Sequence, residues 1–222
     1  MEVDFADGLG WRLLRPDECV RVKYASAGQK DIRLRLRHGN QTWLAHSRVE
    51  VQMEAAANRY SDNPDEIIDL GGTILNFFFD CEDRKLRKPL IVVEGFGGDM
   101  VNYDKMNDLI DIDISPDYKL RDFLDSEGYD LIWVDWANSN ARIQDNASAL
   151  EAAIEYINAR KHADGSSLPN VMIGASMGGL VGKYCLLHMH NVQEKDAEVE
   201  RFFTYDSPLT GANFPVGIQL FV

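Results

Sequence analysis

Hydrophobic positions follow two different rhythms along the chain, and these rhythms divide it into two parts. In residues 1–52 apolar side chains alternate with polar ones, as at Ile32, Leu34 and Leu36, which arginines separate. A period of two predicts strands with one solvent-facing side, so we expect a β-rich, antiparallel segment here. Residues 53–65 lose the alternation and are interpreted as a linker.

From residue 66 onward, apolar runs alternate with amphipathic segments. The runs 90–93 and 131–134 are continuously apolar, which is typical of parallel strands buried on both faces. Apolar residues at intervals of three and four then predict the clearest helix of the chain: Leu150, Ala153, Ile154 and Ile157. Strands that alternate with helices predict an α/β fold, with a doubly wound and mostly parallel sheet in residues 66–222.

Composition narrows the possible partners. The 222 residues include 23 lysines and arginines against 36 aspartates and glutamates, a net charge of −13 that argues against a nucleic-acid partner. No stretch approaches the roughly 20 apolar residues of a membrane span. Three cysteines, at positions 19, 81 and 185, are too few and too scattered to predict a disulfide framework or a metal site. We expect no metal and no cofactor, and the composition leaves the oligomeric state open.

The most informative motif is Gly174-Ala175-Ser176-Met177-Gly178. It follows the apolar run 170–173 and precedes a helix-like segment, which is the strand-turn-helix setting of a nucleophile elbow. On such a turn the hydroxyl of Ser176 projects above the sheet, and Gly174 and Gly178 avoid collisions with the neighbouring strand and helix. The N-terminus of the following helix favours a developing oxyanion. Ser176 is therefore the candidate nucleophile.

Elbow and strand order together resemble the α/β-hydrolase superfamily, in its lipase-like and esterase-like branch, over roughly residues 73–222. The segment 93–98, Val-Glu-Gly-Phe-Gly-Gly, is similar to the His-Gly-Phe-Gly-Gly strand end of lipases, with Glu94 where those enzymes usually carry histidine. The resemblance implies an oxyanion hole formed by the backbone N–H groups of Phe96 and Met177. The alternative is an ordinary glycine-rich turn after a buried strand, which would explain the glycines of this segment without an oxyanion hole.

Asp206 is the candidate acid. It follows a predicted strand in a segment, 205–212, that resembles the Asp-x-Pro-His-x-Gly-Ala stretch of lipase-like hydrolases, with Leu209 in place of the histidine. At 30 positions after Ser176, it fits the order Ser…Asp…His of a catalytic triad. A carboxylate that hydrogen-bonds its own Ser-Pro turn is an equal alternative.

No histidine of the sequence fits the role of the base. His188 and His190, for example, lie on the helix after the elbow at about 18–21 Å from Ser176, at a rise of 1.5 Å per residue. In this superfamily the catalytic histidine follows the last strand. The expectation is therefore that the sheet is C-terminally incomplete here, that the parent protein carries the histidine beyond Val222, and that residues 1–222 alone are inactive or nearly so.

Residues 1–52 also resemble the second half of a PKD-type, immunoglobulin-like module. The segment 3–8 is similar to its Asp-Phe-Gly-Asp-Gly loop, with Ala6 in place of a glycine, and 24–36 to its Tyr-x-x-x-Gly-x-Tyr-x-Val-x-Leu stretch. Such modules usually belong to extracellular or cell-surface proteins, and the resemblance implies that location. The first four residues lack the basic and apolar regions of a signal peptide. A generic β-rich extension is the alternative.

Two functions follow as hypotheses. The first is a serine hydrolase of lipase or esterase type, which cleaves a small-molecule or lipid carboxylic ester through an acyl-enzyme on Ser176. Peptidase and thioesterase chemistry use the same elbow. The second is a non-catalytic cell-surface protein that retains a hydrolase fold for binding or support. Glu94, Leu209 and the lack of a suitable histidine favour the second slightly.

Overall fold

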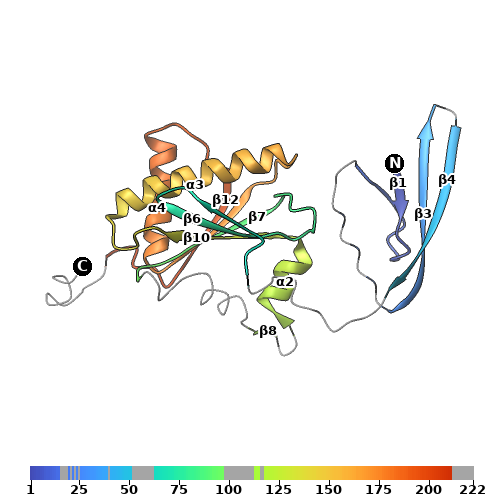
Figure 1. Ribbon diagram of the computed structural model, residues 1–222, viewed down its shortest axis with the longest axis horizontal. Helices are drawn as coiled ribbons and strands as arrows, with labels where there is room; N and C mark the ends of the chain where they lie inside the picture. Colours follow the sequence, from blue (N-terminus) through green and yellow to red (C-terminus); the bar gives the residue numbers. More distant parts are fainter. Residues whose placement is uncertain are drawn as a thin grey trace. The chain divides into compact units, whose positions relative to one another are not determined.

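The computed structural model divides the chain into two compact units, Met1–Ala57 and Asn58–Val222 (Figure 1). The residues that the structure describes are 1–15, 20, 22, 24, 26–39, 41–51, 63–97, 113–115 and 118–211. Most of the expected linker, 53–65, lies outside these residues, so its boundaries stay a prediction.

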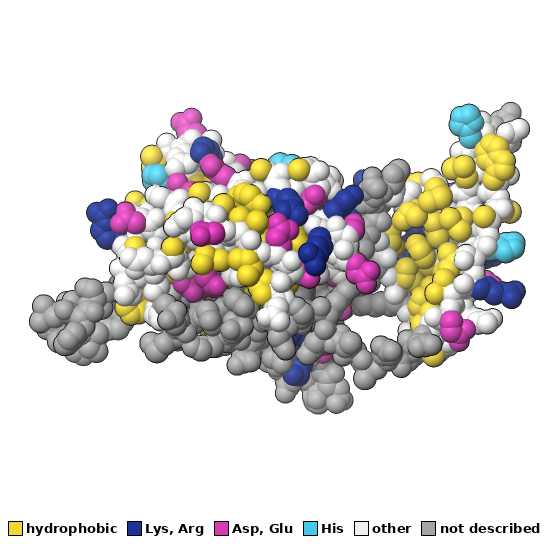
Figure 2. Space-filling model, viewed as in Figure 1, with side chains coloured by type: hydrophobic (Ala, Val, Ile, Leu, Met, Phe, Trp, Pro, Cys, Tyr) yellow, Lys and Arg dark blue, Asp and Glu magenta, His cyan; other side chains and the backbone are white. Residues whose placement is uncertain are grey.

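The first unit is an antiparallel sheet, as the alternation predicts. Its strands are β1 (Glu2–Asp4), β2 (Trp11–Leu13), β3 (Gly28–His38) and β4 (Gln41–Val51), paired in the order β2-β1-β3-β4. Leu34 lies opposite Ala45 and Val3, and Leu36 opposite Trp43, so these side chains share one face. Figure 2 shows hydrophobic side chains gathered over the β3–β4 hairpin. The PKD-like character of this unit stays a prediction.

The second unit contains a six-stranded, mostly parallel sheet. Its order is β12-β11-β7-β10-β6-β5, and the four strands from β12 to β10 run parallel. Strands β5 and β6 form a hairpin whose inner strand pairs antiparallel with β10. The strands are β5 (Glu66–Asp69), β6 (Thr73–Phe78), β7 (Pro89–Val93), β10 (Asp130–Trp136), β11 (Asn170–Ala175) and β12 (Val199–Tyr205).

Helices cover both faces of this sheet, which confirms the doubly wound α/β architecture (Figure 1). On one face α3 (Ile143–Ala163) and α4 (Met177–Asn191) pack against Ile132 and Val134 of β10. On the other face α2 (Leu120–Glu127) packs against Leu131 and Trp133 of the same strand. Alternate residues of one buried strand therefore serve two hydrophobic layers, and this is why the strand sequences are continuously apolar.

α2 begins at Leu120, directly after the short strand β9 (Tyr118–Lys119), which pairs with β8 (Asp113–Ser115). The three cysteines are too scattered to predict a disulfide framework, but Cys81 is disulfide-bonded, while Cys185 is free and buried. Spacing along the sequence does not report distance in space. In the described residues, none of the helices has the length and apolar character needed to cross a bilayer.

Candidate active site

Ser176 stands at the turn between β11 and α4. It has φ 50° and ψ −122°, a region that residues with a side chain rarely adopt, and it is exposed. The turn is held from the neighbouring strand, because the N–H of Ser176 donates to the carbonyl of Tyr205 at 2.8 Å. α4 begins at the next residue, Met177, and the first N–H groups of a helix have no partner within it. The serine is therefore strained, exposed and next to the N-terminus of a helix.

The two elbow glycines are required by the packing around this turn. A Cβ at Gly174 would lie 2.5 Å from the Cα of Gly179, in the first turn of α4. A Cβ at Gly178 would lie 2.3 Å from the carbonyl oxygen of Glu94 and 2.5 Å from that of Val93. These obstacles are backbone atoms, which cannot rotate away. Strand, helix and the end of β7 thus approach more closely than any side chain would permit.

The loop that follows β7 reaches Ser176. A Cβ at Gly95 would lie 2.9 Å from the Cβ of Ser176 and 3.5 Å from its hydroxyl oxygen. Phe96, the next residue, is 43% exposed, and Gly97 has φ 130°. The structure therefore brings together Gly95, Ser176 and the start of α4 at one edge of the sheet.

Asp206 lies at the same edge. In the parallel pairing of β11 with β12, Ala175 lies opposite Tyr205, so Ser176 and Asp206 are the residues that follow the last pair. Asp206 is exposed and also has a positive φ, 46°. Its neighbour Ser207 donates its hydroxyl to the carbonyl of Gly174 at 3.2 Å. Two strained, non-glycine residues side by side are a pattern that functional sites share.

Glu94 is a site residue that sequence reasoning recorded only as a departure from the lipase pattern. Its side chain is buried, at 3% exposure, and one carboxyl oxygen accepts the backbone N–H of Trp136 at 2.7 Å. Its backbone carbonyl accepts the indole N–H of the same tryptophan at 3.1 Å. Burial, together with the neighbouring carboxyl of Asp135, raises the pKa of Glu94 to about 8, although the hydrogen bond from the N–H of Trp136 lowers it in part. A buried glutamate thus anchors the loop that carries Phe96.

Two histidines of the second unit are engaged elsewhere. His188 contacts Glu151 of α3 at 2.6 Å, and His162 contacts Glu198 at 3.0 Å. His188 lies twelve residues along α4 from Ser176, which corresponds to about 18 Å. Neither can take the proton of Ser176. Within the described ranges, no three His, Cys, Asp or Glu side chains are grouped to hold a metal.

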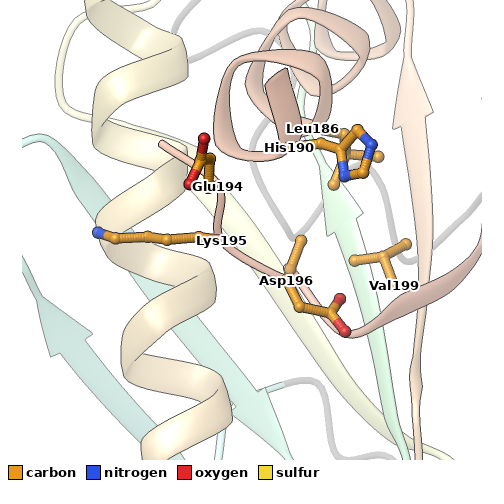
Figure 3. Close-up of a pocket in the computed structure, with 7 residues that line it drawn as sticks. Leu186, His190, Glu194, Lys195, Asp196 and Val199 are labelled. Carbon is orange, nitrogen blue, oxygen red and sulfur yellow. The ribbon is translucent and has the colours of Figure 1, made fainter. Parts of the chain in front are cut away.

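A cavity of about 650 Å³ lies at the other end of α4 (Figure 3). It is lined by Leu186 and His190 of α4, by the following loop and by Val199 at the start of β12. Since Ser176 precedes α4 and Val199 begins β12, this cavity lies at the opposite edge of the sheet from the serine. It is not a binding site for a substrate that reacts at Ser176.

One family model matches the chain. Residues 131–220 match the model described as lecithin:cholesterol acyltransferase, a segment that includes Ser176 and Asp206. This match confirms the expected resemblance to the lipase-like branch of the α/β-hydrolases. No curated protein matches the chain significantly.

Solved esterase structures are also similar in part. Brefeldin A esterase, described as a bacterial homologue of human hormone-sensitive lipase, is 16% identical, with TM-score 0.42 and coverage of 69% of this chain and 42% of that one. The Pyrobaculum calidifontis esterase is 14% identical, with TM-score 0.45 and coverage of 62% and 42%. Thermogutta terrifontis Est2 with butyrate is 12% identical, with TM-score 0.46 and coverage of 64% and 53%. The chain spans about half the length of these structures or less.

Proposed function

We propose that the second unit is the core of a serine hydrolase of lipase or esterase type that cleaves carboxylic esters. The observation that carries this proposal is the strained, exposed conformation of Ser176 between β11 and α4, with backbone packed against Gly174 and Gly178. An ordinary surface serine has no need of a positive φ or of two flanking glycines. An elbow that must present a hydroxyl above a sheet needs both.

The proposed reaction is acyl transfer in two steps. The hydroxyl oxygen of Ser176 attacks the ester carbonyl carbon, its proton passes to a base, and the carbonyl oxygen becomes an oxyanion. The carbonyl re-forms, the alcohol leaves with the proton, and water then releases the acid from the serine by the same route. The N–H groups of Phe96 and Met177 are the proposed oxyanion donors, supported by the contact of Gly95 with Ser176.

Asp206 is the proposed acid of the triad, supported by its place beside the elbow and by its strained backbone. Its alternative role is to hold the turn on which Ser207 packs behind the elbow. The base is proposed to be a histidine, and the one expected beyond Val222 stays a prediction. The proposed location is extracellular or at the cell surface. The disulfide at Cys81 supports it, since disulfides persist in oxidising compartments.

Hydrolysis of short-chain and long-chain nitrophenyl esters by the full-length protein tests the proposal. Ser176→Ala is expected to lower kcat by at least about 10³-fold while the free energy of unfolding stays within about 0.5 kcal/mol. Ser148→Ala, at an exposed serine of α3, is the control and should retain activity. Equal turnover by the wild type and Ser176→Ala would exclude the acyl-enzyme. No turnover by the wild type on any ester would favour the non-catalytic alternative.

The match to an acyltransferase family supports a second outcome of the same chemistry, in which an alcohol rather than water accepts the acyl group. Adding increasing concentrations of a lipid alcohol to the ester assay separates the two. Transfer produces a new ester at the expense of free acid, whereas a hydrolase releases free acid whatever alcohol is present.

A further inference from the structure

Glu94 is tied to its surroundings at every polar group of its residue. Its N–H donates to the carbonyl of Val134 at 3.1 Å, and its own carbonyl accepts the indole N–H of Trp136 at 3.1 Å. Its carboxyl accepts the backbone N–H of Trp136 at 2.7 Å. All three contacts lead to the end of β10. The residue that precedes Gly95 is therefore fixed by its side chain as well as by its backbone.

A second carboxyl faces Glu94. In the parallel pairing of β7 with β10, Val93 lies opposite Val134, so Glu94 and Asp135 follow the last pair side by side. The Oδ2 of Asp135 accepts the side-chain amide of Asn76 on β6 at 2.8 Å, and the Asp135 carboxyl raises the pKa of Glu94. A hydrogen bond between two carboxyl groups requires that one of them keeps its proton, because two carboxylates have no hydrogen to share. Among the described residues, Asp135 is the charged group that acts on Glu94, whereas Asn76 and Trp136 are neutral donors to the pair.

The two candidate oxyanion donors, the N–H groups of Phe96 and Met177, both depend on the position of Glu94. Its carbonyl fills the space that a Cβ of Gly178 would take, at 2.3 Å, and so it packs against the first turn of α4. The next residue, Gly95, packs against Ser176. A second negative charge on the pair would push the Glu94 and Asp135 side chains apart. The displacement would then reach the Phe96 loop directly and the start of α4 through the carbonyl.

We propose that Glu94 and Asp135 share one proton, and that this carboxyl pair positions the Gly95–Phe96 loop against Ser176. Loss of the proton at alkaline pH loosens the loop. Glu94 is then a positioning residue that gives the site an upper pH limit. The consequence for catalysis rests on the proposed function of Ser176, whereas the shared proton does not.

Stability as a function of pH tests the shared proton without any activity. The ordinary pKa of a glutamate is 4.5 and that of folded Glu94 is about 8, so the unfolded chain loses this proton first. The stabilisation is complete below about pH 4.5 and is lost progressively as the pH rises to about 8. Glu94→Gln mimics the protonated acid. In urea unfolding, we expect the free energy of unfolding to fall more steeply between pH 5 and 8 for the wild type than for Glu94→Gln. The difference in slope should correspond to at most one proton.

Two further variants make this result specific. Asp135→Asn replaces the second charge by an amide that can donate to Glu94. The fall in the free energy of unfolding should therefore occur at lower pH. Glu82→Gln, an exposed glutamate before the same strand, should retain the wild-type pH dependence. Parallel curves for the wild type and Glu94→Gln would overturn the proposal.

The positioning role is tested by the rate at which a fluorophosphonate labels Ser176 in the full-length protein. At pH 9 about a tenth of a group with pKa about 8 keeps its proton. The ratio of the Glu94→Gln rate to the wild-type rate should therefore rise about tenfold between pH 6 and pH 9. Glu94→Ala, which cannot hold Trp136, should label slowly at every pH. A constant ratio contradicts positioning. Absent labelling in all variants contradicts the proposed function of Ser176, while the unfolding curves still decide the shared proton.

Discussion

The two edges of the six-stranded sheet are built in opposite ways from the same strands. At the edge where β11 and β12 end, Ser176 and Asp206 both have positive φ and are exposed. At the edge where they begin, the side chain of Lys161 is fully buried and contacts Asn170 and Glu198, each at 2.9 Å. Positive φ also occurs at the second edge, at Glu194 (54°) and Glu198 (55°), so what distinguishes the first edge is an exposed serine whose flanking glycines are crowded by backbone atoms. The second edge satisfies buried polar groups.

This contrast shows how the fold separates function from stability. Strained, exposed residues cost free energy and persist only where the surroundings hold them, which is a pattern of functional sites. A buried cation with two partners at hydrogen-bonding distance is costly to break but supplies no reactive group. The cavity at the Lys161 edge does not change this division, since its lining includes Glu194, which has a positive φ, but no hydroxyl or thiol side chain. Substitutions at the two edges should therefore separate activity from stability.

The largest effect on stability is expected at the Lys161 edge. Lys161→Met leaves Glu198 and Asn170 without their buried partner and should lower the free energy of unfolding by about 3 kcal/mol. Activity or labelling at Ser176 should be unchanged in the folded fraction. Lys195→Met removes a neighbouring lysine whose side chain is 52% exposed, and should cost less than about 0.5 kcal/mol. Chemical unfolding of the wild type, Lys161→Met and Lys195→Met measures the difference. Equal losses of unfolding free energy in the two variants would contradict the contrast between the two edges.

A smaller effect is expected from Gly178→Ala at the elbow edge. The new methyl group meets the carbonyls of Glu94 and Val93, so overpacking should cost about 2 kcal/mol and displace the Phe96 loop. Gly165→Ala is the control, because Gly165 has φ 89° but open space around it. It should cost about 1 kcal/mol through its backbone alone and leave the site intact. Thermal unfolding and the labelling rate of Ser176 together check both variants.

The smallest expected effect has the opposite sign. Ser176→Gly relieves the positive φ and should raise the free energy of unfolding by about 1 kcal/mol while it abolishes activity. Ser176→Ala removes the hydroxyl but keeps a Cβ, so its stability should stay close to that of the wild type. A Ser176→Gly variant that is less stable than Ser176→Ala would show that the turn is not strained.

The sequence predicted the parts of this molecule that depend on neighbours along the chain. The spacing of Leu150, Ala153, Ile154 and Ile157 predicted α3, and all four side chains are buried in the hydrophobic core. The glycines around Ser176 predicted a turn between strand and helix, and the structure has one. Period and turn chemistry are local properties, which a single sequence contains.

What the sequence could not predict depends on contacts between distant residues. Glu94 and Asp135 are 41 positions apart, and only the parallel pairing of β7 with β10 brings them together. The sequence did contain one signal, which is a glutamate followed by a glycine at the end of a buried strand. It was interpreted only as the absence of the histidine that lipases carry there. The disulfide at Cys81 was missed for the same reason, since pairing depends on distance in space.

Mapping the site of covalent labelling tests the central claim most directly. The full-length, folded protein is treated with a fluorophosphonate, digested and sequenced by mass spectrometry, with a sample unfolded in urea as the control. We predict one adduct on the peptide that contains Ser176, absent from the unfolded sample and from Ser176→Ala. An unmodified Ser176 in folded protein, or an adduct on Ser207 instead, would contradict the assignment of the nucleophile.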